Sequence, residues 1–303
     1  MSELGSGFMR IGIIGAGSVG LLMCYYLQKH HEVTLYVRRE EQKQKLITHG
    51  LRLDQQPPVR DIDIKLSHEL INHDLLMICV KQYQLDTVIN QIKQHHIQAD
   101  LLFLQNGMGH IKLIQNLDQP VYLGVVEHGA YRIDEHIVAH TGKGKIKLAA
   151  YSSKKADLDS LYEQLHREEF PFELVSNWYD MLIDKLVVNA VINPLTTLFQ
   201  IKNGEIINNP FVNKLAYKLC SEITHLLDLD LQEQWQKVQQ IALTTSENTS
   251  SMLSDLNAHR PTEVDAITGN LLHKAKHSAP LNSFLYHSIK ALEVKKGIDA
   301  SYA

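Results

Sequence analysis

The sequence predicts an α/β protein with an N-terminal doubly wound sheet followed by an all-helical C-terminal domain. Through the first half of the chain, short apolar runs of strand length alternate with helical windows, which is typical of a mostly parallel sheet with helices on both faces. From Trp178 onward, long helical patterns dominate and few β runs remain. These two observations predict a sheet domain over residues 1–175 and a helical domain over residues 176–303.

The predicted elements of the first half follow in chain order. The short apolar run Arg10–Gly15 ends in glycine and is typical of a buried strand, and good helix formers follow over Ser18–Lys29. The β-branched and aromatic run Glu32–Val37 is the next predicted strand. We expect later strands at 75–80, 101–104 and 121–126, helices at 82–94 and 110–116, and a hairpin or edge addition over 133–149 around residues 141–144.

The composition is that of a soluble globular chain with enough apolar residues for two ordinary domains. Of 303 residues, 44% are hydrophobic and 21% are charged. A formal net charge of -4 gives no bulk attraction to nucleic acid or to acidic membranes, so we expect neither as a partner. The three cysteines, Cys24, Cys79 and Cys220, form no CxxC motif, which argues against a disulfide framework or a zinc site and favours a reducing cytoplasm.

The chain is also expected to contain no membrane span. Its longest apolar run, residues 11–27, is interrupted by glycines, and we find no other run of the roughly 20 apolar residues that cross a bilayer. The first eight residues have no periodicity and are expected to be an extension ahead of a start at Met9.

A glycine fingerprint lies where the first predicted strand meets the first predicted helix. Gly15-Ala16-Gly17-Ser18-Val19-Gly20 has the form GxGxxG. The first glycine permits the tight turn, the second lets the backbone approach a pyrophosphate, and the third allows close packing of helix on strand. A GxGxxG motif alone is weak evidence, but the strand before it and the helix after it favour a Rossmann-type domain that binds a dinucleotide.

The end of the second predicted strand indicates which dinucleotide. An NAD site places an acidic residue there for the ribose 2′-hydroxyl, whereas this strand runs into Arg38 and Arg39. Guanidinium groups suit the 2′-phosphate of NADP, while Glu40 and Glu41 fall in the following loop or helix. The alternative is that both arginines are ordinary solvated surface charges.

A polar stripe lies in the helical half. Lys185, Asn189 and Asn193 are spaced i, i+4 and i+8 among apolar residues, so they share one side of a helix. Such a stripe faces either solvent or a polar cleft, and asparagine is a poor choice for an exposed helix face. Pro194 is expected to kink or break the helix at Asn193.

Glu263 and three histidines each have a structural and a functional interpretation. Glu263, in the segment Arg260–Asp265, is either a charge near the start of a helix or a site residue. His136 and His140 are spaced i, i+4 but lie in a β-rich stretch without a third ligand, so we predict no metal site. His128 could line a site, although a structural or surface role is the better interpretation.

Four motifs together resemble the ketopantoate reductase (2-dehydropantoate 2-reductase) family. They are GAGSVG at 15–20, QNGMG at 105–109, DKLVVNAVINPLTTLFQIKNGE at 184–205 and SSMLSDLNAHRPTEVDAITG at 250–269. The similarity runs from Met9 essentially to the C-terminus, and the two later motifs are far more specific than the glycine loop. The resemblance implies NADPH bound on the Rossmann domain and reduction of 2-dehydropantoate to pantoate, which supplies pantothenate and coenzyme A.

The resemblance also implies roles for individual residues. Lys185 resembles the catalytic lysine of the family, and Glu263 the glutamate near the substrate hydroxyl and the nicotinamide. Three other residues of the helical half resemble substrate-binding residues: Asn189, Asn193 and Ser251. Residues of the Rossmann half resemble cofactor-binding positions, namely Gly15, Ala16, Gly17, Ser18, Val19, Gly20, Arg38, Lys81 and Asn106, of which Asn106 also faces the substrate.

The chemistry of keto-acid reduction agrees with these roles. A hydride must reach the carbonyl carbon and a proton its oxygen, where negative charge develops. A lysine ammonium can polarise the carbonyl and donate the proton, and a nearby carboxylate favours its charged form. Lys185 and Glu263 are therefore expected to act as one electrostatic unit.

Three questions stay open at the level of sequence. A catalytically silent NADP(H)-binding sensor would keep the Rossmann half but would have no need of Lys185, Asn189, Asn193 and Glu263. A reductase of a different branched 2-keto acid would keep all four residues. The oligomeric state is equally open, a homodimer included.

Overall fold

The computed structural model describes residues 8–151, 157–274 and 278–298, so nearly all of the expected N-terminal extension lies outside the described residues. The chain divides into two compact units. The sheet unit runs to Met181 without the loop Asn106–Gly109, and the helical unit comprises that loop and the chain from Leu182.

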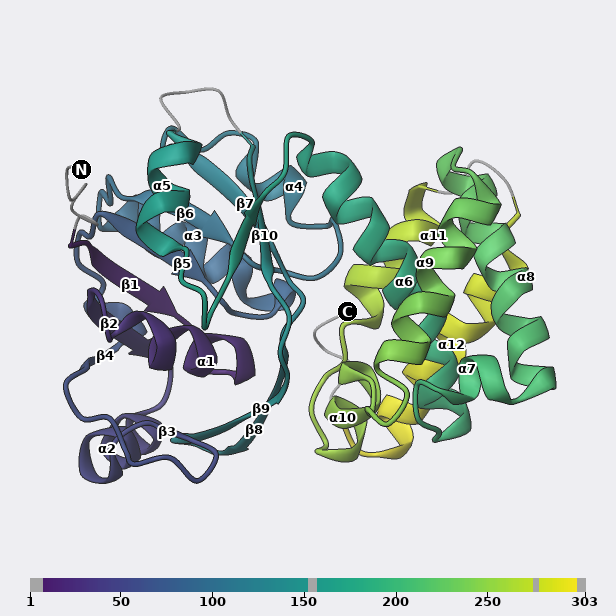
Figure 1. Cartoon of the computed structure of the whole chain (residues 1–303), viewed down its shortest axis with the longest axis horizontal. Helices are drawn as coiled ribbons and strands as arrows, with labels where there is room; N and C mark the ends of the chain where they lie inside the picture. The colour runs from purple at the N-terminus through teal and green to yellow at the C-terminus, as the bar shows by residue number, and fades with distance from the viewer. Residues whose placement is uncertain (1–7, 152–156, 275–277, 299–303) are drawn as a thin grey trace. The chain divides into compact units, whose positions relative to one another are not determined.

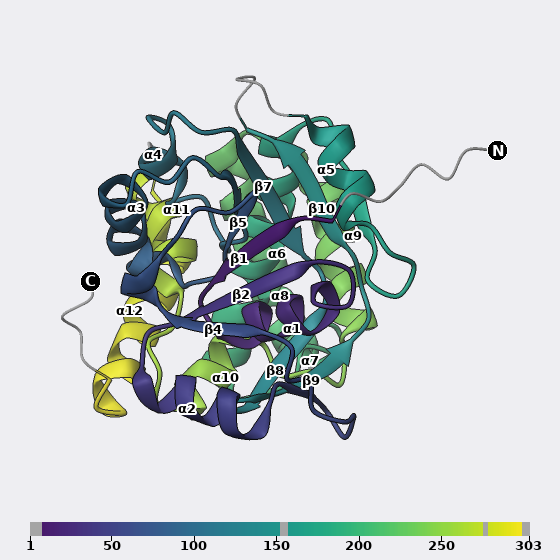
Figure 2. The same cartoon turned by 90° about the vertical axis from the view of Figure 1, so that its left-hand side faces the viewer.

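The main sheet of the sheet unit has the strand order β11-β10-β7-β6-β5-β1-β2-β4. Its six parallel strands are β1 (Arg10–Ile14), β2 (Glu32–Val37), β4 (Asp63–Leu66), β5 (Leu75–Ile78), β6 (Asp100–Phe103) and β7 (Val121–Val126). Strand β10 (Ile146–Ala150) runs antiparallel to β7, and β11 (Phe172–Leu174) extends the sheet beside it. The predicted doubly wound sheet is confirmed, with its order reversing between β1 and β5, as Figure 2 shows.

A second sheet of three strands, β3-β9-β8, covers the first helix. It consists of β3 (Arg52–Leu53), β9 (Ile137–Gly142) and β8 (Gly129–Asp134). Helix α1 (Ser18–Leu27) packs on β1 and β2 on one side and on β8 and β9 on the other (Figure 1). Because a sheet lies on each side of α1, its middle residues are completely buried: Leu21, Leu22, Met23 and Cys24.

The remaining helices of the sheet unit are short. They are α2 (Glu40–His49), α3 (Leu85–Gln94), α4 (Ile111–Ile114) and α5 (Leu158–Leu165), with single 3-10 turns at Ser67–Glu69 and Gln82–Gln84. Helix α2 packs on β2 and β4, and α5 packs on β10 and β11.

One prediction in this unit was wrong. The hairpin turn lies at Glu135–His136, between β8 and β9, and not at residues 141–144. Residues 143–145 instead carry the chain from β9 to β10, which pairs with β7. The glycines of the Thr141–Gly144 segment therefore mark a passage between two sheets, where Gly144 lies against the backbone of Glu127.

The helical unit is built around α6 (Trp178–Phe199), as the sequence predicted for this half. Its other helices are α7 (Glu205–Asn208), α8 (Pro210–Leu227), α9 (Leu231–Thr244), α10 (Ser251–Asn257), the π-helix Asp265–Gly269, α11 (Asn270–Lys274) and α12 (Pro280–Lys295). Short polar side chains cap three of them, since Asn209, Asp230 and Ser250 each accept a hydrogen bond from a backbone amide of the first turn.

Helix α6 continues past Pro194 to Phe199, so of the predicted kink or break at Asn193 the break is wrong. Pro194 is buried within the unit. A proline inside a helix removes one backbone hydrogen bond, and the surrounding packing holds this helix together across that gap.

Length and composition would allow α6 to cross a membrane, with a mean hydropathy of 1.3 in its most apolar window. This stretch was missed among apolar runs because Asp180, Asp184 and Lys185 interrupt it. Since 72% of the window is buried inside the protein, the helix has the features of the core helix of a globular unit.

Candidate functional site

The first and third glycines of the fingerprint are required by packing. Gly15 has a φ of +107° and donates its N–H to the Tyr36 carbonyl across 3.0 Å. A Cβ on Gly15 would lie 2.8 Å from the Val80 side chain, and one on Gly20 would lie 1.8 Å from the Gly15 carbonyl oxygen. These contacts explain the tight turn and the close packing of α1 on β1 that the motif predicts.

The second glycine leaves room for a ligand. A Cβ on Gly17 would meet no atom within 4 Å among the described residues, so nothing in the protein itself requires glycine there. Gly17 directly precedes α1, whose first turn carries no acidic side chain. Open space at the positive end of a buried helix dipole fits the phosphates of a dinucleotide.

The glycine loop lies at the point where the strand order reverses. The loop follows β1, and Val80 and Lys81 follow its neighbour β5. Gln105, after β6, donates its amide to the carbonyls of Ile78 and Val80 across 2.8 and 3.0 Å and fixes this end of the sheet. Ligands of doubly wound sheets bind at this position, which the half-buried Lys81 therefore borders.

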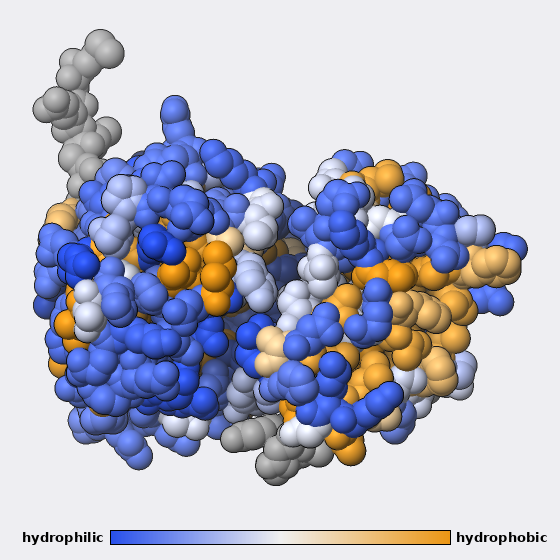
Figure 3. All heavy atoms as spheres, turned by 90° about the horizontal axis from the view of Figure 1, so that it is seen from below, coloured by the Kyte–Doolittle hydropathy of each residue, from blue (hydrophilic) through white to orange (hydrophobic). Residues whose placement is uncertain are grey.

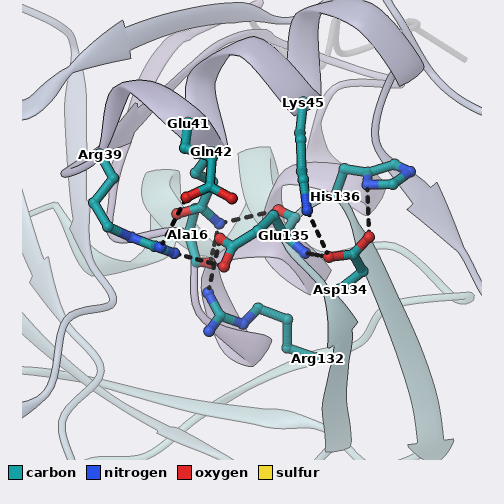
Figure 4. Close-up of polar contacts among 9 residues, drawn as sticks. All are labelled: Ala16, Arg39, Glu41, Gln42, Lys45, Arg132, Asp134, Glu135 and His136. Atoms are coloured by element: carbon teal, nitrogen blue, oxygen red, sulfur yellow. Dashed lines mark hydrogen bonds and ion pairs between the residues drawn. The ribbon is translucent and has the colours of Figure 1, made fainter.

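The two arginines after β2 differ in their contacts, as Figure 4 shows for Arg39. The Arg39 guanidinium lies 2.5 Å from a carboxylate oxygen of Glu135 and 3.8 Å from Glu41. Arg38 is exposed, and within the described part of the chain it makes no hydrogen bond or ion pair. Of the pair, Arg38 is thus the guanidinium that the protein leaves unpaired.

Gln42 supports the glycine loop and was not anticipated from the sequence. This buried side chain donates to the Ala16 carbonyl across 2.9 Å and to the Glu135 carbonyl across 3.0 Å (Figure 4). It therefore ties the fingerprint to the β8–β9 turn. Its signal in the sequence is a glutamine in the first turn of a helix, which is too common to be informative.

The polar stripe of α6 is not an exposed face. Asn193 is only 6% exposed, and Lys185 and Asn189 are half-buried. The neighbouring Asp184 accepts hydrogen bonds from Lys237 across 2.7 Å and from Gln234 across 2.9 Å, both on α9. These contacts anchor α6 beside Lys185, and the surface interpretation of the stripe fails at Asn193.

Glu263 and Asn106 come together within the helical unit although 157 positions separate them. The Asn106 amide donates to a Glu263 carboxylate oxygen across 2.9 Å, and Glu263 is only 6% exposed. Gly107 has a φ of +75°, and a Cβ there would lie 2.4 Å from the Ala266 carbonyl oxygen. Only glycine thus lets the loop Asn106–Gly109 approach the π-helix so closely.

A partly buried polar network surrounds the backbone on both sides of Glu263. The Glu293 carboxylate accepts from the backbone N–H and the hydroxyl of Thr262 across 2.8 and 2.7 Å. Lys290 joins Glu293 to Asp265 across 3.0 and 3.1 Å, and Tyr286 donates to Asp265 across 2.7 Å. Burial alone would lower the pKa of Lys290, but its two carboxylate partners raise it, so the ammonium is retained. Glu263 therefore stands between two anchored neighbours, beside a π-helix of the kind often found at functional sites.

The two adjacent serines have different environments. Ser251 is the exposed first residue of α10. Ser250 is buried, accepts from the Leu253 N–H across 3.3 Å and from the Thr196 hydroxyl across 2.8 Å, and so caps α10 against α6.

His128 has a structural role. Its ring stacks on Phe170 at 4.6 Å, and its Nδ1 lies 3.1 Å from His140 Nε2 and accepts from the Gly144 N–H. His140 in turn contacts the Tyr26 hydroxyl across 3.0 Å. Burial lowers the pKa of His128 to about 4 and also lowers that of His140. Within the described residues, no three His, Cys, Asp or Glu side chains are grouped closely enough to hold a metal ion.

Comparison with known proteins places both units in one family. The family described as ketopantoate reductase PanE/ApbA matches residues 11–153, and its C-terminal domain model matches residues 177–293. The chain belongs to the ketopantoate reductase family. A 2-dehydropantoate 2-reductase from Bacillus subtilis is 41% identical over 292 residues, covering 94% of this chain and 98% of the relative.

Solved structures of similar fold support this assignment to the family. The crystal structure of a probable 2-dehydropantoate 2-reductase from Bacillus subtilis matches with a TM-score of 0.83 and 41% identity, covering 93% of this chain and 99% of that one. A complex of D-mandelate dehydrogenase with NADH matches with a TM-score of 0.85 and 25% identity, covering 95% and 99%. The two family models together contain every candidate site residue named above.

Proposed function

We propose that the chain is an NADPH-dependent 2-dehydropantoate 2-reductase that forms (R)-pantoate in the supply of pantothenate and coenzyme A. The observation that carries this proposal is the match of both units to the family, joined to a polar set on the helical unit that dinucleotide binding alone does not require. A silent sensor would have no need of a buried Asn193 or of a buried, hydrogen-bonded Glu263.

The residues of the sheet unit fit the cofactor. The backbone of residues 15–20 and the start of α1 hold the pyrophosphate, Arg38 binds the 2′-phosphate, and Lys81 lines the same edge of the sheet. When bound, NADPH supplies the hydride that reduces the keto carbon.

The residues of the helical unit act on the substrate. The Lys185 ammonium donates a proton to the keto oxygen as negative charge develops there, and it regains that proton from solvent after turnover. Asn189, Asn193 and Ser251 orient the keto acid. Glu263, held by Asn106, keeps Lys185 charged and contacts the hydroxyl and the nicotinamide.

The test is an NADPH-oxidation assay with ketopantoate beside pyruvate and 2-ketoisovalerate, repeated with NADH. We expect the highest kcat/KM with ketopantoate and NADPH. NADPH consumption with none of the three acids would instead favour the sensor, and a higher kcat/KM with another branched acid would change the substrate. The NADH arm matters because the D-mandelate dehydrogenase of similar fold was solved with NADH.

We further propose that the protein is located in the cytoplasm and that its oligomeric state is a homodimer. All three cysteines are free, as in a reducing compartment. Figure 3 shows apolar side chains in orange over part of the helical unit, whose exposed large residues include Phe211 and Leu215 on α8 and Leu243 on α9. Light scattering coupled to gel filtration measures the mass, and a monomer at micromolar concentration would contradict the dimer.

A further inference from the structure

Glu135 brings an acidic group to the side of the sheet unit where the proposed 2′-phosphate contact lies. It occupies the β8–β9 turn, almost a hundred positions beyond Arg39. One carboxylate oxygen contacts the Arg39 guanidinium at 2.5 Å, and the other lies 3.4 Å from the guanidinium of Arg132 on β8. A single carboxylate thus serves two arginines (Figure 4).

The turn that carries Glu135 is held independently of its carboxylate. Asp134 accepts the Glu135 backbone N–H across 2.7 Å and pairs with Lys45 of α2 across 3.3 Å. The Glu135 carbonyl accepts from Gln42, which also holds Ala16 of the glycine loop. Replacing only the carboxylate of Glu135 therefore leaves the link between the turn and the loop in place.

The charges around Arg39 differ from those around Arg38. Glu135 is 16% exposed at its side chain, so its pairing with Arg39 is more shielded from solvent than an ordinary surface contact. Glu41 adds a second carboxylate at 3.8 Å. Arg38 is exposed and unpaired within the described part of the chain.

We propose that Glu135 is a specificity-determining residue for the cofactor, because it engages Arg39 and offsets part of the positive charge beside the 2′-phosphate. Discrimination between NADPH and NADH then rests on Arg38. This inference depends on the proposed use of NADPH, and it assigns the strength of the preference to a residue outside the glycine loop and the β2 terminus.

Removal of the negative charge has a defined consequence. In the Glu135→Gln variant, Arg39 and Arg132 keep their positive charges but lose their shared counter-ion, so a 2′-phosphate at the end of β2 meets a more positive field. Since the Arg39 guanidinium is 43% exposed and solvent screens its charge, we expect only a moderate gain, with NADPH bound about three- to fivefold more tightly. NADH lacks the phosphate, and its affinity is expected to stay unchanged.

The experiment measures dissociation constants for NADPH and NADH by nucleotide fluorescence for wild type, E135Q, R39A and the R39A/E135Q double variant. R39A alone is expected to change little, because Glu135 already engages that guanidinium. The double variant should lose most of the gain shown by E135Q. The matched control is E40Q, which removes an exposed carboxylate of the first turn of α2 that bonds to Gln44 and not to an arginine.

Three outcomes would overturn the inference. They are an equal change of both affinities in E135Q, a gain in E135Q no larger than that in E40Q, and a tenfold loss of NADPH affinity in R39A. The test compares the dissociation constant of each variant with that of wild type, separately for NADPH and for NADH. These ratios test the role of Glu135 whichever cofactor wild type prefers. A wild type that prefers NADH would count against the proposed function alone.

Discussion

The two units present their candidate site residues in different ways. In the sheet unit the site consists largely of backbone: a turn at Gly15, an open position at Gly17 and the start of α1. In the helical unit it consists of side chains projected from helices that lie far apart in the sequence, such as Lys185 on α6 and Glu263 before the π-helix. The first construction suits a large cofactor with a constant pyrophosphate, and the second suits a small substrate at which charge must be stabilised at one atom.

This difference predicts where single substitutions affect binding and where they affect chemistry. A backbone site changes when a Cβ or a charge alters the space around a ligand. A site built from side chains loses its function when one functional group is removed. Five experiments test the difference between the two units, from the largest expected effect to the smallest.

Lys185→Ala should lower kcat by about 10²–10³ with little change in NADPH affinity, since it removes the proton donor and the positive charge at the keto oxygen. Steady-state kinetics and cofactor titration measure the two effects separately. Lys202→Ala is the control, because that lysine also belongs to the helical unit but is exposed and pairs with Glu247, away from the stripe on α6. Turnover of Lys185→Ala near that of wild type would exclude the proposed proton donor.

A double variant tests the coupling of Lys185 to Glu263. If the two side chains act as one unit, Lys185→Ala/Glu263→Ala should be less impaired than the product of the single effects. Strictly multiplicative losses in kcat/KM would show that the two residues act independently.

Acid should destabilise the sheet unit more than the helical unit. Burial lowers the pKa of both His73 and His128 to about 4, below the unfolded value of 6.5. The unfolded chain therefore binds more protons between these values, and stability is lost as the pH falls from 6.5 towards 4. Each pKa unit corresponds to about 1.4 kcal/mol, so between pH 6.5 and pH 4.5 His128 alone accounts for a loss of about 2–3 kcal/mol of stability.

The helical unit should lose less stability in acid, because its described histidines are all exposed. They are His225, His259, His273 and His287. Hydrogen exchange at pH 7 and pH 4.5, corrected for intrinsic rates, compares β1, β2 and β7 with α8 and α9. Equal loss of protection in the two sets of elements would contradict the prediction. The His128→Asn variant, which keeps an acceptor for the Gly144 N–H, should lose part of the pH dependence.

The same division explains how much of the molecule the sequence could predict. Contiguous signals were sufficient for the fold class, for β1, α1, β2 and β7, and for the glycine loop, because each depends on neighbouring residues. The spacing of Lys185, Asn189 and Asn193 predicted that they share one helix face. Whether that face is exposed to solvent was decided only by the structure, in which Asn193 is buried. The resemblance to the family supplied roles that spacing alone left open.

Contacts between distant segments were beyond the reach of local patterns. The bond between Asn106 and Glu263 depends on a glycine loop meeting a π-helix. The pairing of Arg39 with Glu135 depends on where a hairpin turns, and the glycines at 142 and 144 indicated the wrong position for that turn. Pro194 was expected to kink or break α6 at Asn193, but the helix continues past this buried proline to Phe199.

Arg38→Ala should weaken NADPH ten- to hundredfold relative to NADH, because each charge-assisted hydrogen bond lost costs roughly 1.5–3 kcal/mol. Titration of both cofactors against wild type measures the change, and the Arg38→Ala/Arg39→Ala variant shows whether Arg39 substitutes for the missing group. Equal weakening of both cofactors would assign Arg38 to the general fold of the β2 terminus and not to the 2′-phosphate.

The adjacent serines before and at the start of α10 give the smallest and most direct test. Ser251→Ala should raise KM for ketopantoate at unchanged kcat and unchanged stability, because Ser251 is exposed and is proposed to bind ground and transition states alike. Ser250→Ala removes the cap of α10 and the partner of the Thr196 hydroxyl, so it should cost about 1 kcal/mol of stability, measured by urea unfolding. A fall in kcat for Ser251→Ala at constant KM would place that hydroxyl in the transition state. Equal destabilisation by both substitutions would mean that Ser251, like Ser250, belongs to the support of the helix and not to the substrate site.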